Sequence, residues 1–573
     1  SVLLAVVGLV CAFDWLFPLR GAPSYGSAAL LTVLGVPWTI GLFRFEARGS
    51  GPPSSWRWLV RFGALALLVS FLFAKWLVLL RAAGAPGDFI GSSRSYTLAL
   101  FSAFALGLVA RSLRLARFLE AAADHPARLM VLSFGITGLL GALVLSMPFS
   151  IETVRTVSLV DNLFMAFSAV CVTGLSVNNV AETYSMAGQA VLCALIQVGG
   201  LGIMVLSAAI SILSGRKLKV KSSAVLAEMV DSSSLHSLRR TIVTIVLFTF
   251  VIESAGALVL YSKFSAYPEI SERYGHELAG AGDARWAAIF HAVSAFCNAG
   301  FSNMTAGLVP FVGSPRVTLT VTVLILLGGI GFPVLDELAR ALFTRLRGRR
   351  VPAFSLNTRI ALRTSALLFG GMALLHLVLE WRHSMQALSF PARVLASLFQ
   401  SASCRTAGFN VVDIGAMSAA MLVVTCAAMF VGASPGSCGG GIKTTTLAVL
   451  FAGFRSELLA RPARLLDRTV PQAVVRRATG VAFLSMVLVF GILFLLLLLE
   501  KQAPLPLAYE VVSAFSTTGL STGITPSLST PGKLVITLTM FIGRIGPLTL
   551  ALALARKAQS RLLELPEERV MIG

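Results

Sequence analysis

The sequence predicts an all-α polytopic membrane protein of four repeated units, each a span, a short helix, a glycine turn and a span, after about four additional N-terminal transmembrane helices. The first reason is composition, since 56% of the 573 residues are hydrophobic, 13% are charged and the mean hydropathy is +0.83. A soluble core cannot bury that much apolar surface. The second reason is repetition, because a small-polar, Gly, apolar pattern recurs at Gly174, Gly300, Gly408 and Gly519, with spacings of 126, 108 and 111 residues.

The extra N-terminal spans occupy residues 1–117. A helix needs about 20 apolar residues to cross a bilayer, and boundaries taken from sequence carry an error of about 2 to 4 residues. The expected spans are 2–19, 28–42, 59–80 and 96–109. Because the chain begins at Ser1 without methionine, we expect a preceding piece and do not interpret the first span as a signal peptide.

The four units follow at 126–221, 236–350, 355–468 and 471–573, the last with the C-terminal tail. Their first spans are expected at 129–147, 242–260, 360–379 and 474–499, and their second spans at 187–213, 317–342, 416–450 and 534–555. The short helices at 160–171, 287–297, 393–403 and 508–516 hold roughly 9 to 12 residues, too few to cross a bilayer. They must re-enter the membrane, and the turns that follow must be buried in protein or line water. Four such turns favour a shared central pore.

The glycine turns suit a monovalent cation. Backbone carbonyls replace the water shell of a cation without a fixed charge that holds it too tightly, and the negative end of each short helix also favours a cation. Glycine supplies conformations that other L-residues resist. The expected filter carbonyls belong to Val172, Thr173, Gly174 and Leu175; Asn298, Ala299, Gly300 and Phe301; Thr406, Ala407, Gly408 and Phe409; and Thr517, Thr518, Gly519 and Leu520. One such turn is common in membrane helices, but these four also share a preceding Ser-Ala context at Ser168, Ser294, Ser401 and Ser513.

A glycine-rich loop at 432–442 interrupts the second span of the third unit, because its composition cannot sustain a helix. The glycines of interest there are Gly436, Gly439, Gly440 and Gly441. Ile442 separates Gly441 from Lys443 and no strand precedes the loop, so we do not expect it to bind a nucleotide phosphate. A packing kink is the alternative to a functional loop.

Together these motifs resemble the Trk/Ktr/HKT superfamily of potassium transporters, nearest the bacterial TrkH and KtrB membrane subunits, over residues 126–556. The second spans add Gly199-Gly200-Leu201-Gly202, Gly328-Gly329-Ile330-Gly331, the stretch from Gly436 to Thr446, and Gly543-Arg544-Ile545-Gly546-Pro547. In that family each unit is span, pore helix, filter and span, and glycine at all four filter positions accompanies potassium selectivity. A serine at the first position is associated with sodium-permeable plant members, so Gly174 implies potassium. The leading spans exceed the family's eight-span plan, to which TrkH-like members add two.

The resemblance also implies roles for the glycine-rich loop and for Arg544, and other charged residues are candidates by their position. It makes the 432–442 loop an intramembrane gate below the filter and turns Arg544 toward the pore, where it would raise a barrier to cations or anchor the loop. Lys443 is a weaker gate candidate, equally explained as a residue that completes the loop. Arg405 is expected to brace the third turn through carbonyls. Glu253 is expected to pair with a neighbour, with a coupling-cation site or a proton relay as alternatives.

Simple structural roles are expected for the other polar candidates. Asp161 and Asn162 open the first short helix as capping residues, and His291 packs the second one. The seven cysteines lack CxxC spacing and the six histidines are scattered, so neither disulfides nor zinc are expected.

The net charge of +21 comes from loops between apolar segments. These basic loops lie at 44–57, 111–117, 216–221, 340–350, 455–477 and 556–561, and they alternate with acidic or mixed loops such as 269–283. The positive-inside rule then places them, and both chain ends, in the cytoplasm, without nucleic acid as a partner. The expected location is the bacterial inner membrane, multi-pass and in contact with lipid.

The expected function is potassium-selective uptake across the plasma membrane through the filter, gated by the intramembrane loop. The alternative is a sodium-permeable or poorly selective transporter of the same architecture. An enzyme, or a carrier with inverted repeats, would predict clustered intramembrane acids or histidines, or units of opposite orientation. The resemblance implies a homodimer and a TrkA/KtrA-like cytoplasmic regulatory ring, with nucleotide bound only on that partner. No cofactor is expected in this chain, and K⁺ is the transported ion.

Overall fold

The computed structural model describes residues 126–152, 157–213, 235–265, 281–350 and 353–546. The spans expected in residues 1–117, the basic segments at 216–221 and 556–561, and the C-terminal tail lie outside the described residues. Within the described ranges the regular structure is helical, apart from an antiparallel hairpin of β1 (Arg464–Leu465) and β2 (Arg468–Thr469).

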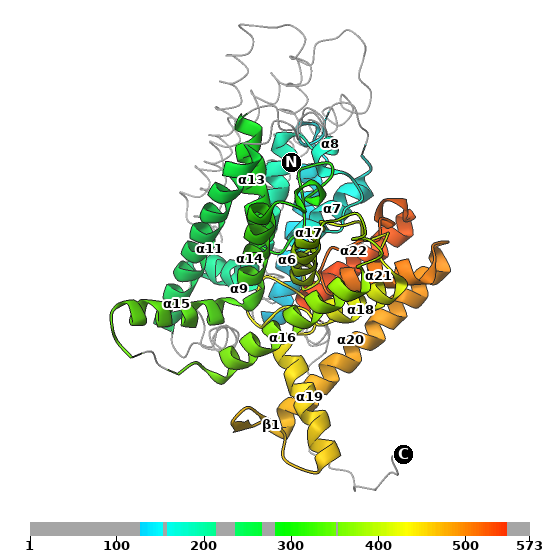
Figure 1. The fold of residues 1–573 in the computed structure, drawn as a ribbon. Coiled ribbons are helices and arrows are strands. Elements are labelled where there is room, and N and C mark those ends of the chain that lie inside the picture. The colour runs from blue at the N-terminus through cyan, green and yellow to red at the C-terminus, as the bar shows by residue number, and fades with distance from the viewer. Residues whose placement is uncertain (1–125, 153–156, 214–234, 266–280, 351–352, 547–573) are drawn as a thin grey trace, which may run out of the picture.

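Each unit contributes a first long helix, a shorter helix that precedes the glycine turn, and a second segment of one or two helices after the turn (Figure 1). The first unit holds α6 (Pro126–Leu145), η1 (Pro148–Ser150), α7 (Leu159–Val170), α8 (Val180–Thr183) and α9 (Met186–Leu213). The second holds α11 (Leu235–Phe264), α13 (Ala281–Phe296), η3 (Val309–Phe311), α14 (Pro315–Ile330) and α15 (Phe332–Leu346). The third holds α16 (Leu356–Leu379), α17 (Phe390–Ser403), α18 (Ala419–Phe430) and α19 (Thr444–Leu459). The fourth holds α20 (Gln472–Leu499), α21 (Pro504–Phe515), η4 (Thr525–Ser527) and α22 (Thr530–Ile545).

The second long helices break at glycines with positive φ. Gly202 (φ 75°) interrupts α9, Gly546 (φ 89°) ends α22, and Gly331 (φ 98°) separates α14 from α15, which are bent by 107°. L-residues resist this left-handed region, whereas glycine enters it freely. The second segment expected at 317–342 is therefore a bent pair of helices, since α15 leaves the direction of α14 and projects from the helical body (Figure 1).

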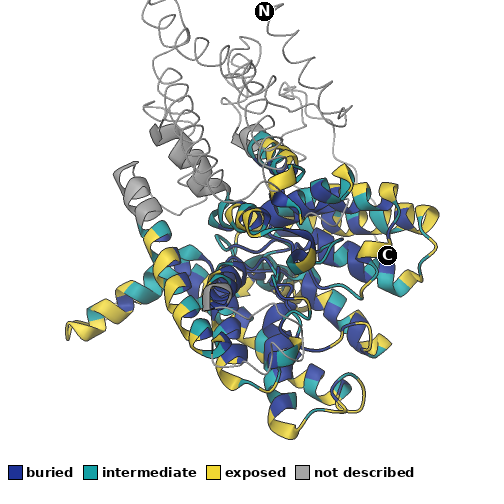
Figure 2. Ribbon diagram, turned by 90° about the horizontal axis from the view of Figure 1, so that it is seen from above, coloured by how far each residue is buried: buried dark blue, intermediate teal, exposed yellow. Residues whose placement is uncertain are grey.

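The outward surface of the long helices is apolar. In the part of the chain that the structure describes, three helices are long and apolar enough to cross a membrane, Thr244–Phe264, Leu356–Leu379 and Gln472–Leu499, and the bent α14–α15 pair is a fourth candidate. Leu367 on α16 and Phe483 on α20 are 76% and 70% exposed. Figure 2 shows exposed residues along the peripheral helices and buried ones where the helices meet. Such an apolar exterior suits lipid contact.

Two glutamates hold the start of the second segments of the third and fourth units. Glu380, directly after α16, accepts hydrogen bonds from Ser418 N (3.0 Å) and Oγ (2.6 Å) at the start of α18. Glu500, directly after α20, accepts from Ser529 N (3.0 Å) and Oγ (2.5 Å) at the start of α22. Each clamp fixes where its second helix begins relative to its first.

Candidate functional site

The four glycine turns share one backbone conformation. Each follows its short helix directly, and φ is positive at the glycine and at the residue two positions before it. The φ values are 56° and 94° at Val172 and Gly174, 60° and 69° at Asn298 and Gly300, 72° and 80° at Thr406 and Gly408, and 50° and 90° at Thr517 and Gly519. Positive φ is rare outside glycine, above all at β-branched residues, and such strain clusters at functional sites.

The turns meet in a closed ring. A Cβ built on Gly300 would lie 2.6 Å from the Ala407 carbonyl oxygen, and one on Gly408 would lie 2.5 Å from that of Thr518. A Cβ on Gly519 would collide with the Thr173 carbonyl, and one on Gly174 with the Ala299 carbonyl. The first unit therefore touches the second, the second the third, the third the fourth, and the fourth the first. Only glycine fits at these four places, for lack of space as well as for backbone conformation.

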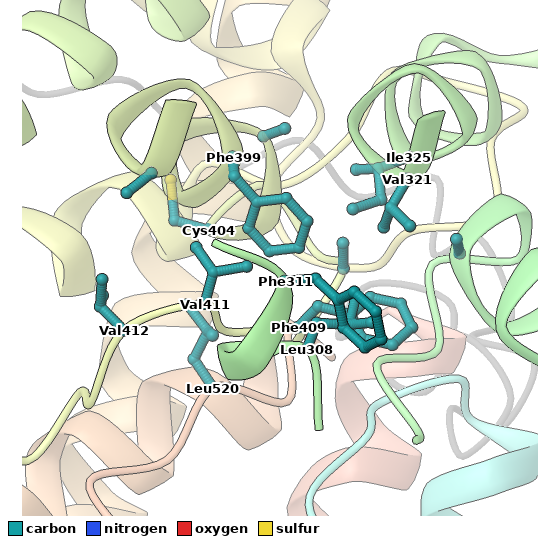
Figure 3. Close-up of a cluster of buried hydrophobic side chains, with 14 of the residues drawn as sticks. Leu308, Phe311, Val321, Ile325, Phe399, Cys404, Phe409, Val411, Val412 and Leu520 are labelled. Atoms are coloured by element: carbon teal, nitrogen blue, oxygen red, sulfur yellow. The ribbon is translucent and has the colours of Figure 1, made fainter. Parts of the chain in front are cut away.

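The side chains that follow the glycines point away from the ring into the buried cores. Phe409 and Leu520 belong to one cluster of buried hydrophobic residues, with Phe311 and Val411 (Figure 3). Leu175 and Phe301 belong to the other cluster. All four side chains are at most 2% exposed. The ring is therefore built from backbone, as a carbonyl filter requires.

Serines at the ends of the short helices brace the turns. Ser168 Oγ accepts from Gly174 N (3.1 Å) and donates to Leu175 O (2.7 Å), Ser294 Oγ donates to Phe301 O (2.8 Å), and Ser513 Oγ accepts from Gly519 N (3.0 Å). In the third unit Ser401, which shares the Ser-Ala context, is not the brace, because it donates to Phe369 O on α16 (2.6 Å). Ser403 donates to Phe409 O in its place, one position later than the other serines.

The 432–442 loop packs against the ring and against the broken second helix of the second unit. Ser434 N and Cys438 N donate to Gly329 O (3.1 Å) and Gly328 O (3.3 Å), and Phe332 N donates to Gly436 O (2.9 Å). The first two contacts use carbonyls freed where α14 ends at Ile330, and the third uses the amide of the first residue of α15.

The same loop also reaches the turns. Gly440 N donates to Thr517 Oγ1 (3.0 Å), and a Cβ on Gly439 would collide with Thr406 Oγ1. Gly436 and Gly441 have φ of 69° and 67°, so both need glycine conformations. The loop is thus a compact plug against the third and fourth turns.

Two basic residues hold the loop. Arg544 on α22 donates from Nη1 to Cys438 O in the loop and from Nη2 to Gly199 O on α9, and its guanidinium carbon lies 5.9 Å from the centre of the Phe134 ring. Lys443 Nζ donates to Gly439 O (2.7 Å) within the loop itself. Arg544 therefore ties the loop to the first unit, whereas Lys443 closes the loop on itself.

Other polar candidates make local contacts. Arg405 donates to Ser365 O (3.3 Å) and Oγ (2.9 Å) on α16, so it braces the third turn through a helix carbonyl and not through filter carbonyls. Glu253, 5% exposed, accepts a hydrogen bond from the Cys297 thiol (3.7 Å), in line with the expected pairing. His291 packs α13 as expected, bonded to Ala287 O and Ser302 Oγ.

Asp161 does more than cap. The N-cap of α7 is Ser158, while Asp161 forms an ion pair with Lys533 of α22 (2.7 Å). The Asn162 side chain donates a hydrogen bond to Ser146 Oγ and accepts one from the Tyr184 hydroxyl. These bonds connect the first unit to the fourth and the first short helix to its flanking segments.

Glu510 is a candidate that sequence reasoning missed. It is fully buried on the short helix α21, accepts from Thr525 Oγ1 (3.0 Å) and from Ser521 Oγ, and so holds the segment after the fourth turn. The available signal was an acidic residue inside an otherwise apolar short helix.

The sequence is similar to those of known cation transport proteins. The family model TrkH, described as "Cation transport protein", matches residues 94–564. The chain is 34% identical to Ktr system potassium uptake protein B of Bacillus subtilis over 452 residues, covering 78% of this chain and 97% of that protein. It is 36% identical to the protein of the same name from Vibrio alginolyticus over 451 residues, covering 78% and 94%. It is 34% identical to the potassium/sodium uptake protein NtpJ of Enterococcus hirae over 458 residues, covering 78% and 97%.

The fold is also similar to a solved structure. The crystal structure of the potassium transporter TrkH from Vibrio parahaemolyticus superposes with a TM-score of 0.61 at 20% sequence identity, covering 86% of this chain and 97% of that one. This likeness confirms the predicted all-helical class. With a family match over most of its length, the chain is a multi-pass membrane protein and not an enzyme, and it belongs to the TrkH family of cation transport proteins.

Proposed function

We propose that this chain carries potassium into the cell through the closed ring of four glycine turns. The observation that supports the proposal best is the shared backbone of those turns, each with positive φ at the glycine and two residues before it. A ring of carbonyls with buried side chains offers a cation oxygen ligands and no fixed charge. The names of the Bacillus and Vibrio relatives, both potassium uptake proteins, favour potassium as the ion.

The 432–442 loop is proposed as the gate. It lies against Thr517 and Thr406, the first residues of the fourth and third turns, so an ion that leaves the ring meets the loop. Arg544 is proposed as its anchor, because the guanidinium bonds the loop and α9 together. The same positive charge would also oppose a cation beside the loop.

We further propose the inner membrane as the location, with both termini cytoplasmic, a homodimeric state and a cytoplasmic nucleotide-binding ring as regulator. The basic segments at 340–350, after the bend at Gly331, and at 455–477, around the β1–β2 hairpin, are proposed as cytoplasmic surfaces near that ring. The names of two relatives, each part of a Ktr system, support a multi-component assembly.

A second candidate is a transporter that admits sodium as well as potassium. The name of the Enterococcus relative, a potassium/sodium uptake protein, favours it. Both candidates use the same ring, so the selectivity of flux separates them.

The test is cation flux into proteoliposomes that contain this chain, comparing potassium, rubidium, sodium and lithium for wild type, Gly174→Ser and Gly370→Ser. Gly370 on α16 is the matched control, since a Cβ there meets nothing within 4 Å. Potassium and rubidium flux that excludes sodium, relaxed by Gly174→Ser alone, would support the proposal. Equal sodium flux in wild type would favour the second candidate, and identical selectivity in all three proteins would refute the ring as filter.

A further inference from the structure

One position behind the ring differs between units in a regular way. Nine residues before each filter glycine stand Met165, His291, Phe399 and Glu510, and each of these side chains is 0% exposed. Two are apolar and two are polar. The polar ones belong to the second and fourth units, which face each other across the ring because each touches only the first and third.

Both polar side chains bond a serine two residues after the filter glycine of their own unit. His291 Nε2 lies 2.9 Å from Ser302 Oγ, and Glu510 accepts from Ser521 Oγ. His291 Nδ1 lies 2.8 Å from Ala287 O, and a carbonyl only accepts, so Nδ1 carries the proton and Nε2 of the neutral ring accepts from Ser302. Glu510 also accepts from Thr525 Oγ1 (3.0 Å).

These bonds tie the chain on the far side of each turn to its short helix. The serine braces Ser294 and Ser513 hold the glycine region itself, whereas His291 and Glu510 hold the segment that leaves it. The His291 ring also stacks on Phe409 of the third turn, with centroids 6.2 Å apart and planes at 27°. A buried polar group without a partner costs free energy, so both side chains favour the backbone position that satisfies them.

We propose that His291 and Glu510 are a pair of positioning residues on opposite units that set the size of the carbonyl ring and thereby its discrimination between potassium and sodium. The inference rests on the proposed function and adds residues that do not touch the ion. The first and third units fill the same place by packing of Met165 and Phe399. Losing one such hydrogen bond releases about 0.5–1.5 kcal/mol of restraint, which corresponds to a roughly 2- to 10-fold change in the ratio of potassium to sodium flux.

The experiment measures that ratio in proteoliposomes for His291→Leu, Ser302→Ala, Glu510→Leu and Ser521→Ala, and for His291→Leu combined with Ser302→Ala and with Ser521→Ala. Met165→Leu is the apolar control. Each single variant of His291, Ser302, Glu510 or Ser521 should lower the flux ratio about 2- to 10-fold, and Met165→Leu should leave it unchanged. His291→Leu combined with Ser302→Ala should lower the flux ratio no more than either change alone, because both remove the same bond. The effects of His291→Leu and Ser521→Ala on the ratio should multiply, because these residues lie on opposite units. If His291→Leu does not fold, Ser302→Ala removes the same bond from the partly exposed side.

The outcomes separate the two proposals. If the wild type excludes sodium and the flux ratio of every one of these variants stays within twofold of the wild-type ratio, this inference is overturned and the proposed function stands. Multiplying effects within the His291 and Ser302 pair also overturn it, because the two would then act separately. A wild type that does not discriminate between the ions refutes the proposed filter, and this inference with it.

Discussion

Replacing Arg544 by alanine should increase potassium flux. The guanidinium donates two hydrogen bonds, to Cys438 O in the gate loop and to Gly199 O on α9, and the alanine variant loses both. Only the bond to Cys438 O depends on whether the loop is seated, because Gly199 lies on α9. A charge-assisted bond contributes about 1.5–3 kcal/mol, so at the lower limit the seated loop loses about 1.5 kcal/mol relative to the displaced one, about a tenfold shift in their ratio. If about 1% of wild-type loops are displaced, flux should rise about tenfold.

The assay is rubidium uptake into proteoliposomes at matched protein incorporation. Arg544→Lys separates the two roles of the charge, because lysine keeps the charge but not the planar fork that reaches two carbonyls. An anchor predicts a lysine variant well above wild type, and a purely electrostatic barrier predicts one equal to it. Arg393→Ala is the matched control, since Arg393 donates to Leu388 O and Gln386 O (both 2.8 Å) away from the loop. Unchanged or lower flux in folded Arg544→Ala would refute the reasoning.

Three further predictions use single features. Gly408→Ala should lower potassium uptake at least about tenfold, since φ is 80° and the new Cβ would meet Thr518 O at 2.5 Å; uptake near the wild-type level would contradict the ring packing. Copper(II)-phenanthroline should join the thiols of Cys297 and Cys438, which both lie against Gly200, taking two electrons as two protons leave, and lock the loop so that flux falls until dithiothreitol restores it. Cys438→Ser should be insensitive, and an oxidant effect that persists there would point to another target. Burial raises the pKa of Glu380 but the hydrogen bonds from Ser418 and Ser384 outweigh it, so the pKa lies below 4.5 and the clamp stabilises the fold above that pH. The melting temperature should therefore fall on acidification through that lowered pKa, and Glu380→Gln should flatten the decline; parallel curves for both proteins would exclude the clamp as the cause.

Sequence pattern predicts the short helices and glycine turns because length, apolar character and glycine placement are local properties. Positive φ at Val172 and Thr517 is not predictable in this way, since β-branched residues ordinarily avoid that region and only the packed ring holds them there. The 107° bend at Gly331 has the same origin, because glycine permits a break while the loop bonded to the freed carbonyls determines it. The shift from Ser401 to Ser403 depends on which hydroxyl faces Phe409 O, a three-dimensional fact.

The contact between loop and ring means that gating and selectivity are coupled. Gly440 N donates to Thr517 Oγ1, and Thr517 holds φ at 50°, so displacement of the loop removes one bond from a strained residue of the fourth turn. Any change that frees the loop should then relax the ring. Arg544→Ala should therefore lower the potassium-to-sodium flux ratio by roughly 2- to 10-fold, the equivalent of one hydrogen bond, while total flux rises. Thr517→Val, which keeps the side-chain shape without the hydroxyl, should lower the flux ratio by a similar factor. The double variant Arg544→Ala/Thr517→Val should have the same ratio as Thr517→Val alone. If Arg544→Ala raises flux at an unchanged ratio, the loop and the ring act independently, and the bond from Gly440 to Thr517 carries no information between them.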